Sequence, residues 1–231
     1  MRKLGLIGGT GPESTIAYYR AVINGVQEQA GAEVLPPLAI ESLSVFTVLG
    51  LCAREDYDAL TDYLATAVRN LAAAGAEVAS LTALTPHIVF DRLQDSSPIP
   101  LVSAIDATRD AAREQGATRL ALLGTKPTMT QGFFARPLAQ AGFEVLIPAP
   151  DEVEFVQDRI VRELEYGIVT DATLAGFIAV IERLRDEEGA QQVILGCTEL
   201  PLLLNDAVSP IPCLDPVQAH TRALVAAVLA G

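Results

Sequence analysis

The feature that most constrains this chain is an internal duplication. Three segments of the first half recur in the same order in the second half, at offsets of 116, 114 and 112 residues. Because order and spacing agree almost throughout, the matches indicate two copies of one structural unit. The matched pairs are residues 4–8 with 120–124, 75–83 with 189–197, and 97–100 with 209–212.

The repeated segments indicate the fold class. Residues 4–8 and 120–124 are short apolar runs that end in glycine before a polar loop, which is typical of buried parallel strands followed by βα loops. Alternation of such strands with amphipathic stretches predicts an α/β protein of two lobes, each a short parallel sheet flanked by helices. The clearest helical stretches are residues 14–29, 57–74 and 174–187.

The repeat also suggests where the lobes begin and end. We predict a first lobe of residues 1–98 plus 208–231 and a second lobe of residues 99–207. The apolar, helical stretch at residues 220–229 is expected to pack back on the first lobe.

Composition excludes several classes of protein. Half of the 231 residues are hydrophobic, which indicates an ordered globular chain, and the net charge of −13 argues against nucleic-acid partners. Three cysteines fit a reducing cytosol better than a disulfide scaffold. No segment approaches the roughly 18–20 apolar residues that span a membrane. We therefore predict a soluble, cytoplasmic protein with no membrane partner.

Chemistry is expected in the loops that follow the strands, because ligands of parallel α/β sheets gather at the carboxyl ends of the strands. The first loop is glycine-rich but lacks the spacing of a dinucleotide fingerprint. Its backbone N–H groups and the hydroxyls of Ser14 and Thr15 suit a carboxylate instead. If the lobes face each other, four loops converge on one cleft: residues 8–15, 82–87, 124–128 and 196–199.

Cys197 is the strongest single candidate for a reactive group. It follows an apolar strand, and residues 198–201 suggest a helix start whose dipole favours the thiolate. Lowering the thiol pKa from about 8.5 to about 7 requires roughly 2 kcal/mol. A helix terminus supplies about 0.3–1 kcal/mol, so we expect Thr198 to donate a hydrogen bond as well. The alternative is a small buried core cysteine, and we interpret Cys52 (on a loop) and Cys213 (on a strand) in that way.

Residues 5–19 and 195–201 resemble the aspartate/glutamate racemase superfamily, most closely its cofactor-independent aspartate racemases. The resemblance implies two lobes related by a pseudo-twofold axis, with a small acidic amino acid or related carboxylate between them. It also implies one cysteine per lobe, of which one removes the α-proton as thiolate and the other donates a proton to the opposite face. The resemblance further implies that no pyridoxal phosphate or metal takes part, and it is compatible with a homodimer.

The resemblance assigns roles residue by residue. Cys197 matches the second-lobe cysteine, and Glu199 stands where glutamate racemases have a histidine that orients or activates the thiol. Arg54 resembles an arginine that pairs with the distal carboxylate of the substrate, and Lys126 is a further candidate for binding an anion. The positions that match binding of the substrate's amino and α-carboxylate groups are Thr10, Ser14, Thr85 and Thr198.

One departure from the family pattern is serious. The first-lobe motif is usually Cys-Asn-Thr-x-His, whereas residues 83–87 read Ala-Leu-Thr-Pro-His. Ala83 is thus a vacant second-base position, and loss of one general acid or base typically costs about 10²–10⁴-fold. Thr82 is one residue off and should point to the opposite face. His87 is a candidate replacement or a fixed histidine at a helix start, and His220 is interpreted as structural.

These observations leave three hypotheses open. The first is a racemase of the aspartate/glutamate type, impaired or one-sided because of Ala83. The second is a single-cysteine decarboxylase or isomerase of small carboxylic acids, and the third is a silent carboxylate-binding protein. Leu84, which replaces the usual asparagine, makes a more apolar substrate conceivable.

Overall fold

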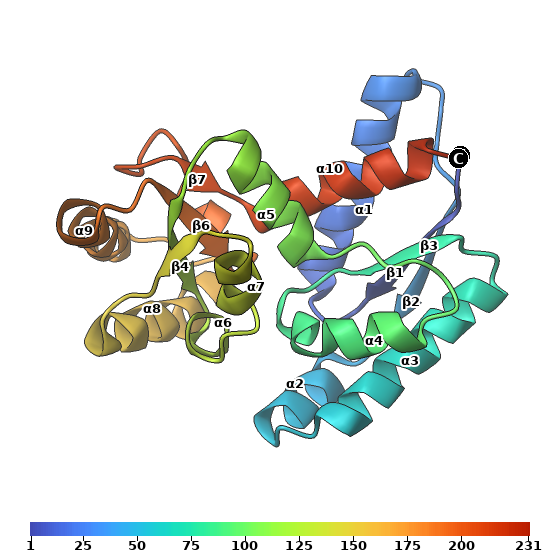
Figure 1. Ribbon diagram of the computed structural model, residues 1–231, viewed down its shortest axis with the longest axis horizontal. Helices are drawn as coiled ribbons and strands as arrows, with labels where there is room; N and C mark the ends of the chain where they lie inside the picture. The colour runs from blue at the N-terminus through green and yellow to red at the C-terminus, as the bar shows by residue number, and fades with distance from the viewer. The chain divides into compact units, whose positions relative to one another are not determined.

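The computed structural model describes residues 1–231, and the chain divides into two compact units (Figure 1). The first unit comprises Met1–Ala107 and Val217–Gly231, and the second comprises Thr108–Pro216. Both boundaries lie nine residues after the predicted ones, at 107 against 98 and at 216 against 207. The reason is that the segments after Ser97 and Ser209 still run beside the sheet of their own unit.

The first unit contains a parallel three-stranded sheet in the order β2-β1-β3, with β1 (Leu4–Gly8) in the centre. The other two strands are β2 (Leu38–Ser42) and β3 (Val78–Leu81). Its helices are α1 (Pro12–Ala30), α2 (Val45–Ala53), α3 (Tyr57–Ala73), the 3-10 helix η1 (Thr85–Val89), α4 (Phe90–Ser96), the start of α5 (Ala104–Glu114), and α10 (Pro216–Leu229).

The second unit contains a parallel four-stranded sheet in the order β5-β4-β6-β7. The strands are β4 (Arg119–Gly124), β5 (Glu144–Leu146), β6 (Gln192–Gly196) and β7 (Cys213–Leu214). Its other elements are α6 (Lys126–Thr130), α7 (Ala135–Gln140), α8 (Pro150–Arg162), η2 (Leu164–Tyr166), α9 (Asp171–Glu188) and η3 (Leu200–Leu202). The predicted α/β class, with parallel sheets flanked by helices, is confirmed.

The registers of the two sheets reproduce the duplication. In each unit, the second repeated strand pairs on one side with the central strand. On its other side it pairs with the segment that follows the repeated Ser-Pro-Ile-Pro. The partners differ by the same 116, 114 and 112 residues that the sequence shows. The equivalent triplets are Gly5, Ala79 and Leu101 in the first unit and Ala121, Val193 and Cys213 in the second.

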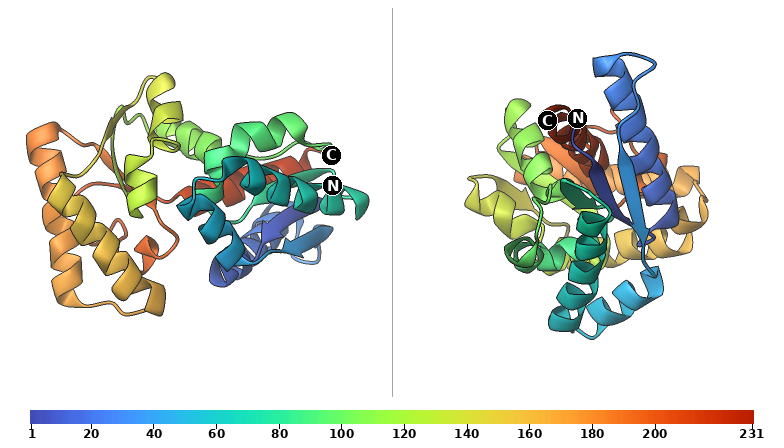
Figure 2. Two further views of the ribbon diagram at one scale, coloured as in Figure 1. Left: turned by 90° about the horizontal axis from the view of Figure 1, so that it is seen from below. Right: turned by 90° about the vertical axis from the view of Figure 1, so that its right-hand side faces the viewer.

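Two cores cover the two faces of the first sheet. Successive side chains of a strand point to opposite faces, so Leu6 packs with α1 and α10, whereas Ile7 packs with α2 and α3. Figure 1 and Figure 2 show α10 against the same unit as α1 and β1. The prediction that the C-terminal stretch packs on the first lobe is therefore confirmed, and Val225 and Val228 are its buried contacts.

Local signals explain where the predicted helices begin and end. Asp56 accepts a hydrogen bond from the Ala59 N–H (3.2 Å) and caps α3, and the Thr170 hydroxyl caps α9 by accepting from the Thr173 N–H (3.1 Å). The left-handed conformation of Gly189 (φ 69°) ends α9. Among all the helices, none combines the length and the apolar character that crossing a membrane would take.

Candidate functional site

Cys197 lies directly after β6, where two strands approach each other closely. Gly124 and Gly196 pair across β4 and β6, and a Cβ atom at either glycine would lie 2.7 Å from a backbone oxygen of the neighbouring strand. Cys197 is 9% exposed, and its Sγ–H donates to Oε2 of Glu199 over 2.8 Å. The Thr198 hydroxyl donates to Oε1 of the same carboxylate, also over 2.8 Å. Both carboxylate oxygens of Glu199 therefore hold a neighbouring side chain.

The electrostatic surroundings of Cys197 differ from the sequence prediction. Burial, followed by the negative charge of Glu199 and its hydrogen bond, raises the pKa of the Cys197 thiol well above its usual value. The expected helix start is a 3-10 helix of three residues, Leu200–Leu202, whose few peptide units carry little dipole. Thr198 donates to Glu199 rather than to the sulfur. These surroundings favour the neutral thiol of Cys197 over the thiolate that the sequence suggested.

A third acidic group lies near this pair. The pKa of Glu165, in η2, is raised by partial burial and by the charge of Glu199, and the charge of Glu165 in turn raises the pKa of Cys197. Glu165 is not among the residues that the sequence motifs point to. In the sequence it is one glutamate in an acidic stretch, and such stretches are equally common on solvated surfaces.

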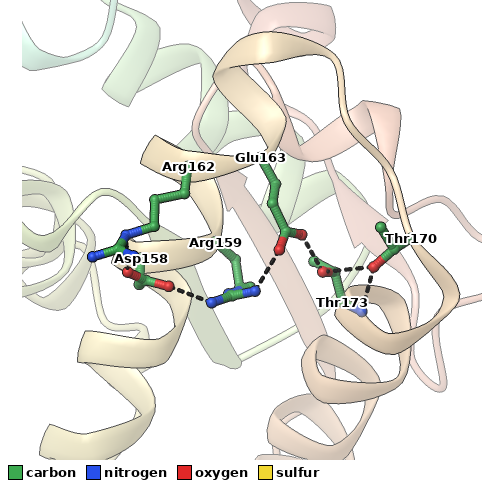
Figure 3. Close-up of polar contacts among 6 residues, drawn as sticks. All are labelled: Asp158, Arg159, Arg162, Glu163, Thr170 and Thr173. Atoms are coloured by element: carbon green, nitrogen blue, oxygen red, sulfur yellow. Dashed lines mark hydrogen bonds and ion pairs between the residues drawn. The ribbon is translucent and has the colours of Figure 1, made fainter.

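A polar network fixes the segment that carries Glu165 (Figure 3). Glu163 ends α8, where one of its carboxylate oxygens pairs with Arg159 and the other accepts from the Thr173 hydroxyl in α9. Asp158 pairs with the other end of the Arg159 guanidinium over 2.5 Å. Because Glu163 links α8 to the first turn of α9, the η2 turn between the two helices is held in place.

The glycine-rich first loop leaves a buried polar group without a partner. Gly9 has φ 75°, and a Cβ atom there would collide with the backbone of Leu43. Its N–H donates to the Thr15 hydroxyl over 3.0 Å, which fixes the turn into α1. Thr10 is only 9% exposed, and its hydroxyl oxygen is buried without a hydrogen-bond partner. A buried hydroxyl of this kind is rare and indicates a site that a ligand completes.

The start of α1 supplies further donors beside Thr10. The helix has 19 residues, and no side chain caps it at Gly11. The N–H groups of Glu13 and Ser14 belong to its first turn, so they have no partner within the helix. The Ser14 hydroxyl donates to the Thr82 carbonyl over 2.5 Å and keeps lone pairs free. The N–H groups at this end of α1 suit a carboxylate, as the sequence predicted. The predicted hydroxyl donors do not, because the hydroxyl protons of Ser14 and Thr15 already bond to the carbonyls of Thr82 and Gly11.

The loop that contains Ala83, the vacant second-base position, is held by burial and hydrogen bonds. Ala83 is equivalent to Cys197 by the register of the two sheets. Thr82 is fully buried, and its hydroxyl donates to the Ile7 carbonyl over 3.1 Å, so it is turned into the fold and offers no acid to a ligand. Leu84 is buried, and Thr85, half-buried, opens η1.

His87 is not placed for acid–base work. Its Nε2 accepts from the Ala104 N–H over 3.1 Å, so the proton of the neutral ring lies on Nδ1, which donates to the Ala83 carbonyl over 3.0 Å. The ring stacks on Phe90, with centroids 5.2 Å apart. Burial lowers the pKa of His87 to about 4. With both nitrogens engaged, His87 fits the alternative interpretation of a fixed histidine at a helix start.

His220 is structural, as predicted. It is completely buried, its Nδ1 contacts the Tyr18 hydroxyl over 2.8 Å, and its Nε2 contacts Ser80 Oγ (2.8 Å) and the Val102 carbonyl (3.0 Å). Since the carbonyl only accepts, Nε2 carries the proton and Tyr18 donates to Nδ1. Burial and the neighbouring His87 lower the pKa of His220 to about 3.

Lys126 and Arg54, the two cations assigned to substrate binding, both lie at exposed positions. Lys126 is exposed and pairs with Glu154 of α8, while its backbone N–H donates to Gln157 Oε1 over 2.5 Å. Its charge is therefore already partnered. Arg54 is exposed at the end of α2.

The other two cysteines both lie in regular secondary structure. Cys213 lies on β7, as predicted. Cys52 lies within α2 and not on a loop, so that placement was wrong. Ser44, the N-cap of α2, stands before an apolar run that signals this helix in the sequence. No group of three or more His, Cys, Asp or Glu side chains is placed to hold a metal ion.

Comparison with known proteins gives consistent matches along the whole chain. Residues 7–224 match the family described as Asp/Glu/Hydantoin racemase. The broad specificity amino-acid racemase RacX of Bacillus subtilis is 23% identical over 230 residues, which cover 98% of each chain. A candidate Asp/Glu racemase from Yersinia pestis is 34% identical with a TM-score of 0.94, and covers 99% of this chain and 100% of its own. An aspartate racemase homologue from Pyrococcus horikoshii is 35% identical with a TM-score of 0.89 over the same shares.

Proposed function

Since the chain belongs to the Asp/Glu/hydantoin racemase family, we propose that it is an amino-acid racemase that works without pyridoxal phosphate and moves the Cα proton through Cys197. The observation that carries this proposal is the 2.8 Å hydrogen bond from the Cys197 thiol to Glu199. It joins the one family cysteine that the chain retains to a group that can take and return its proton.

Cys197 and Glu199 act as a pair in this proposal. Proton abstraction begins when the thiol proton passes to the Glu199 carboxylate, and the thiolate then takes the Cα proton. The electron pair of the broken C–H bond stays on the substrate as a carbanion that its carboxylate delocalises. Reprotonation reverses each step. The raised pKa of the Cys197 thiol makes it a better proton donor than proton acceptor. Proton abstraction therefore requires that the positive ammonium group of the substrate help to stabilise the thiolate.

The first loop holds the substrate carboxylate in this proposal. The unpartnered Thr10 hydroxyl and the first-turn N–H groups of α1 supply the donors. Hydrogen bonds to charged groups contribute about 1.5–3 kcal/mol each, and the helix terminus adds about 0.3–1 kcal/mol. These contributions suffice to fix one end of a small ligand without any cation.

Ala83 makes the proposed reaction one-sided. A methyl group neither accepts nor donates a proton, and His87 has no free nitrogen to replace the missing thiol. Cys197 therefore removes and returns the proton on one face, and inversion depends on water at the other. We expect exchange of the Cα proton with solvent to run faster than racemisation, by about 10²–10⁴-fold, the usual contribution of one acid or base.

A test follows Cα–H exchange and chirality together. L- and D-amino acids are incubated with the enzyme in D₂O, and deuterium incorporation is read by NMR while enantiomers are separated by chromatography. The Cys197→Ser variant should lose exchange, and Cys213→Ser, in the same unit, should keep it. Absence of Cα exchange with every amino acid would overturn the proposal.

Ala83 also favours a second candidate, decarboxylation of a small dicarboxylic acid. Loss of CO₂ leaves the electron pair of the broken C–C bond on carbon, and a single proton donor then completes the reaction. The resting neutral thiol of Cys197 suits that donation. Release of CO₂ from malonate-like acids, lost in Cys197→Ala, is the measurement that supports this candidate over the first.

A further inference from the structure

An open groove of about 420 Å³ lies in the first unit, beside the loop that forms the proposed carboxylate site. One wall is the first turn of α1, and the other is the segment that joins β2 to α2. The volume falls within the range of pockets that take small molecules. The residues that matter here are Pro12, Thr15, Ile16, Leu43, Val45 and Phe46.

The groove is apolar and carries no charged side chain. The polar groups that line it are three hydroxyls, those of Thr15, Ser42 and Ser44. Thr15 already contacts the Gly9 N–H and the Gly11 carbonyl. Phe46 is 83% exposed at one wall of the groove. The apolar lining and the open ring of Phe46 thus give the groove a surface that an apolar group can cover.

The groove and the proposed carboxylate site share the loop at the start of α1. Gly9 and Pro12 line the groove, and they flank Thr10, whose buried hydroxyl lacks a partner. A small ligand held by its carboxylate at the start of α1 thus has an apolar surface directly beside it. The combination of anion donors and an apolar groove matches an amino acid whose side chain carries no charge.

We infer that this groove accepts the side chain of the substrate, and that the substrate class is amino acids with apolar side chains rather than aspartate or glutamate. This inference rests on the proposed function and names its substrate. Arg54, which the resemblance assigns to the distal carboxylate, is not among the residues that line the groove.

The magnitudes favour an apolar side chain over a second carboxylate. The start of α2 at Val45 also lines the groove and offers an anion a helix terminus. At an exposed helix end that interaction changes affinity by about two- to fivefold. Burial of an apolar side chain of leucine size changes affinity by more than about tenfold. A distal carboxylate would also lose water without meeting a cation, which weakens its binding further.

A substrate panel tests the inference. Exchange at Cα in D₂O and ligand binding by calorimetry are measured for L-alanine, L-leucine, L-methionine, L-aspartate and L-glutamate. We expect kcat/KM for exchange to be at least tenfold higher for leucine or methionine than for aspartate or glutamate. Exchange confined to the acidic amino acids would overturn the inference and leave the proposed function standing. If leucine binds but no exchange occurs, the proposed function is overturned and the inference about the groove stands. If leucine shows no binding and no amino acid shows exchange, both are overturned.

Two exposed positions of α2 give a matched pair of variants. Phe46→Lys places a cation at the groove, whereas Leu49→Lys places one on the same helix at an exposed residue (51%) that does not line the groove. Phe46→Lys should shift the ratio of leucine to glutamate kcat/KM toward glutamate by about tenfold or more, and Leu49→Lys should leave it unchanged. Equal shifts in both variants, or none in Phe46→Lys, would overturn the inference.

Discussion

Two buried histidines in the first unit predict a steep loss of stability in acid. His87 and His220 lie with ring centroids 6.0 Å apart, and hydrogen bonds satisfy both rings in their neutral forms. The Ala104 N–H and the Tyr18 hydroxyl are the donors to these rings, so protonation would set a donor against a donor. Burial lowers the pKa of His87 to about 4 and that of His220 to about 3, from an ordinary value of 6.5.

The sign follows from proton linkage. Both pKa values are lower in the folded state, so the unfolded chain binds protons first as the pH falls below 6.5. These groups therefore cost no stability above pH 6.5, and the loss grows as the pH falls toward 4 for His87 and toward 3 for His220. At pH 4.5 each histidine lowers the free energy of unfolding by about 2–3 kcal/mol. The sum approaches the lower end of the typical 5–15 kcal/mol for a whole domain.

Urea unfolding of three proteins at pH 7.0 and 4.5 measures this loss. In His87→Gln, the fall in unfolding free energy between the two pH values should be about 2–3 kcal/mol smaller than in the parent chain, whatever the variant costs at pH 7. Val26→Ala is the control, because it costs stability through lost packing in the core of the same unit and keeps both histidines and their hydrogen-bond donors. Carboxylates titrate alike in all three proteins and cancel. If His87→Gln shows the same fall as the parent, the reasoning is refuted.

Three further predictions concern Ala83 and two residues next to Cys197. Ala83→Cys should raise the ratio of racemisation to Cα exchange by at least about tenfold, as measured by chiral chromatography and NMR, because it restores a second acid or base. Thr198→Val should lower the exchange rate severalfold and alter its pH profile by freeing the Glu199 carboxylate, whereas Thr198→Ser should retain the parent profile. Gly196→Ala should lower the free energy of unfolding by about 1–3 kcal/mol in a urea titration, because its Cβ would lie 2.7 Å from the Leu123 carbonyl oxygen.

The fold was predictable because its signals are local and repeated. Apolar runs of four to six residues and the glycines at their ends encode the parallel strands, and the nearly equal offsets of the repeat encode the register of Ala79 and Val193 in their sheets. Helix ends were similarly legible from caps such as Gly189. The segment of α2 escaped because its apolar residues face out as well as in, as Phe46 does. Only the Ser44 cap and the apolar run after it mark this helix, and no amphipathic pattern supports them.

The state of Cys197 was not predictable, because it depends on depth and on a contact that spacing does not encode. A sequence shows that a thiol follows a strand, but not that it is almost fully buried or that the next turn is a 3-10 helix of three residues. The same holds for the direction of the Glu199 side chain. A carboxylate two residues from the thiol can point to solvent as readily as to sulfur, and only the structure shows the 2.8 Å contact.

The two copies of the repeated loop have been specialised in opposite ways. After β6, the loop carries its polar atoms in side chains that hold one another, with Thr198 and Cys197 both donating to Glu199. After β3, the equivalent loop is tied to the core through its backbone, because His87 bridges the Ala83 carbonyl to the Ala104 N–H. The Ala83 methyl takes no part in that bridge, so the loop owes its conformation to His87 and not to residue 83. A thiol can therefore be introduced at Ala83 without loss of the local structure, whereas replacement of His87 would disturb the loop itself.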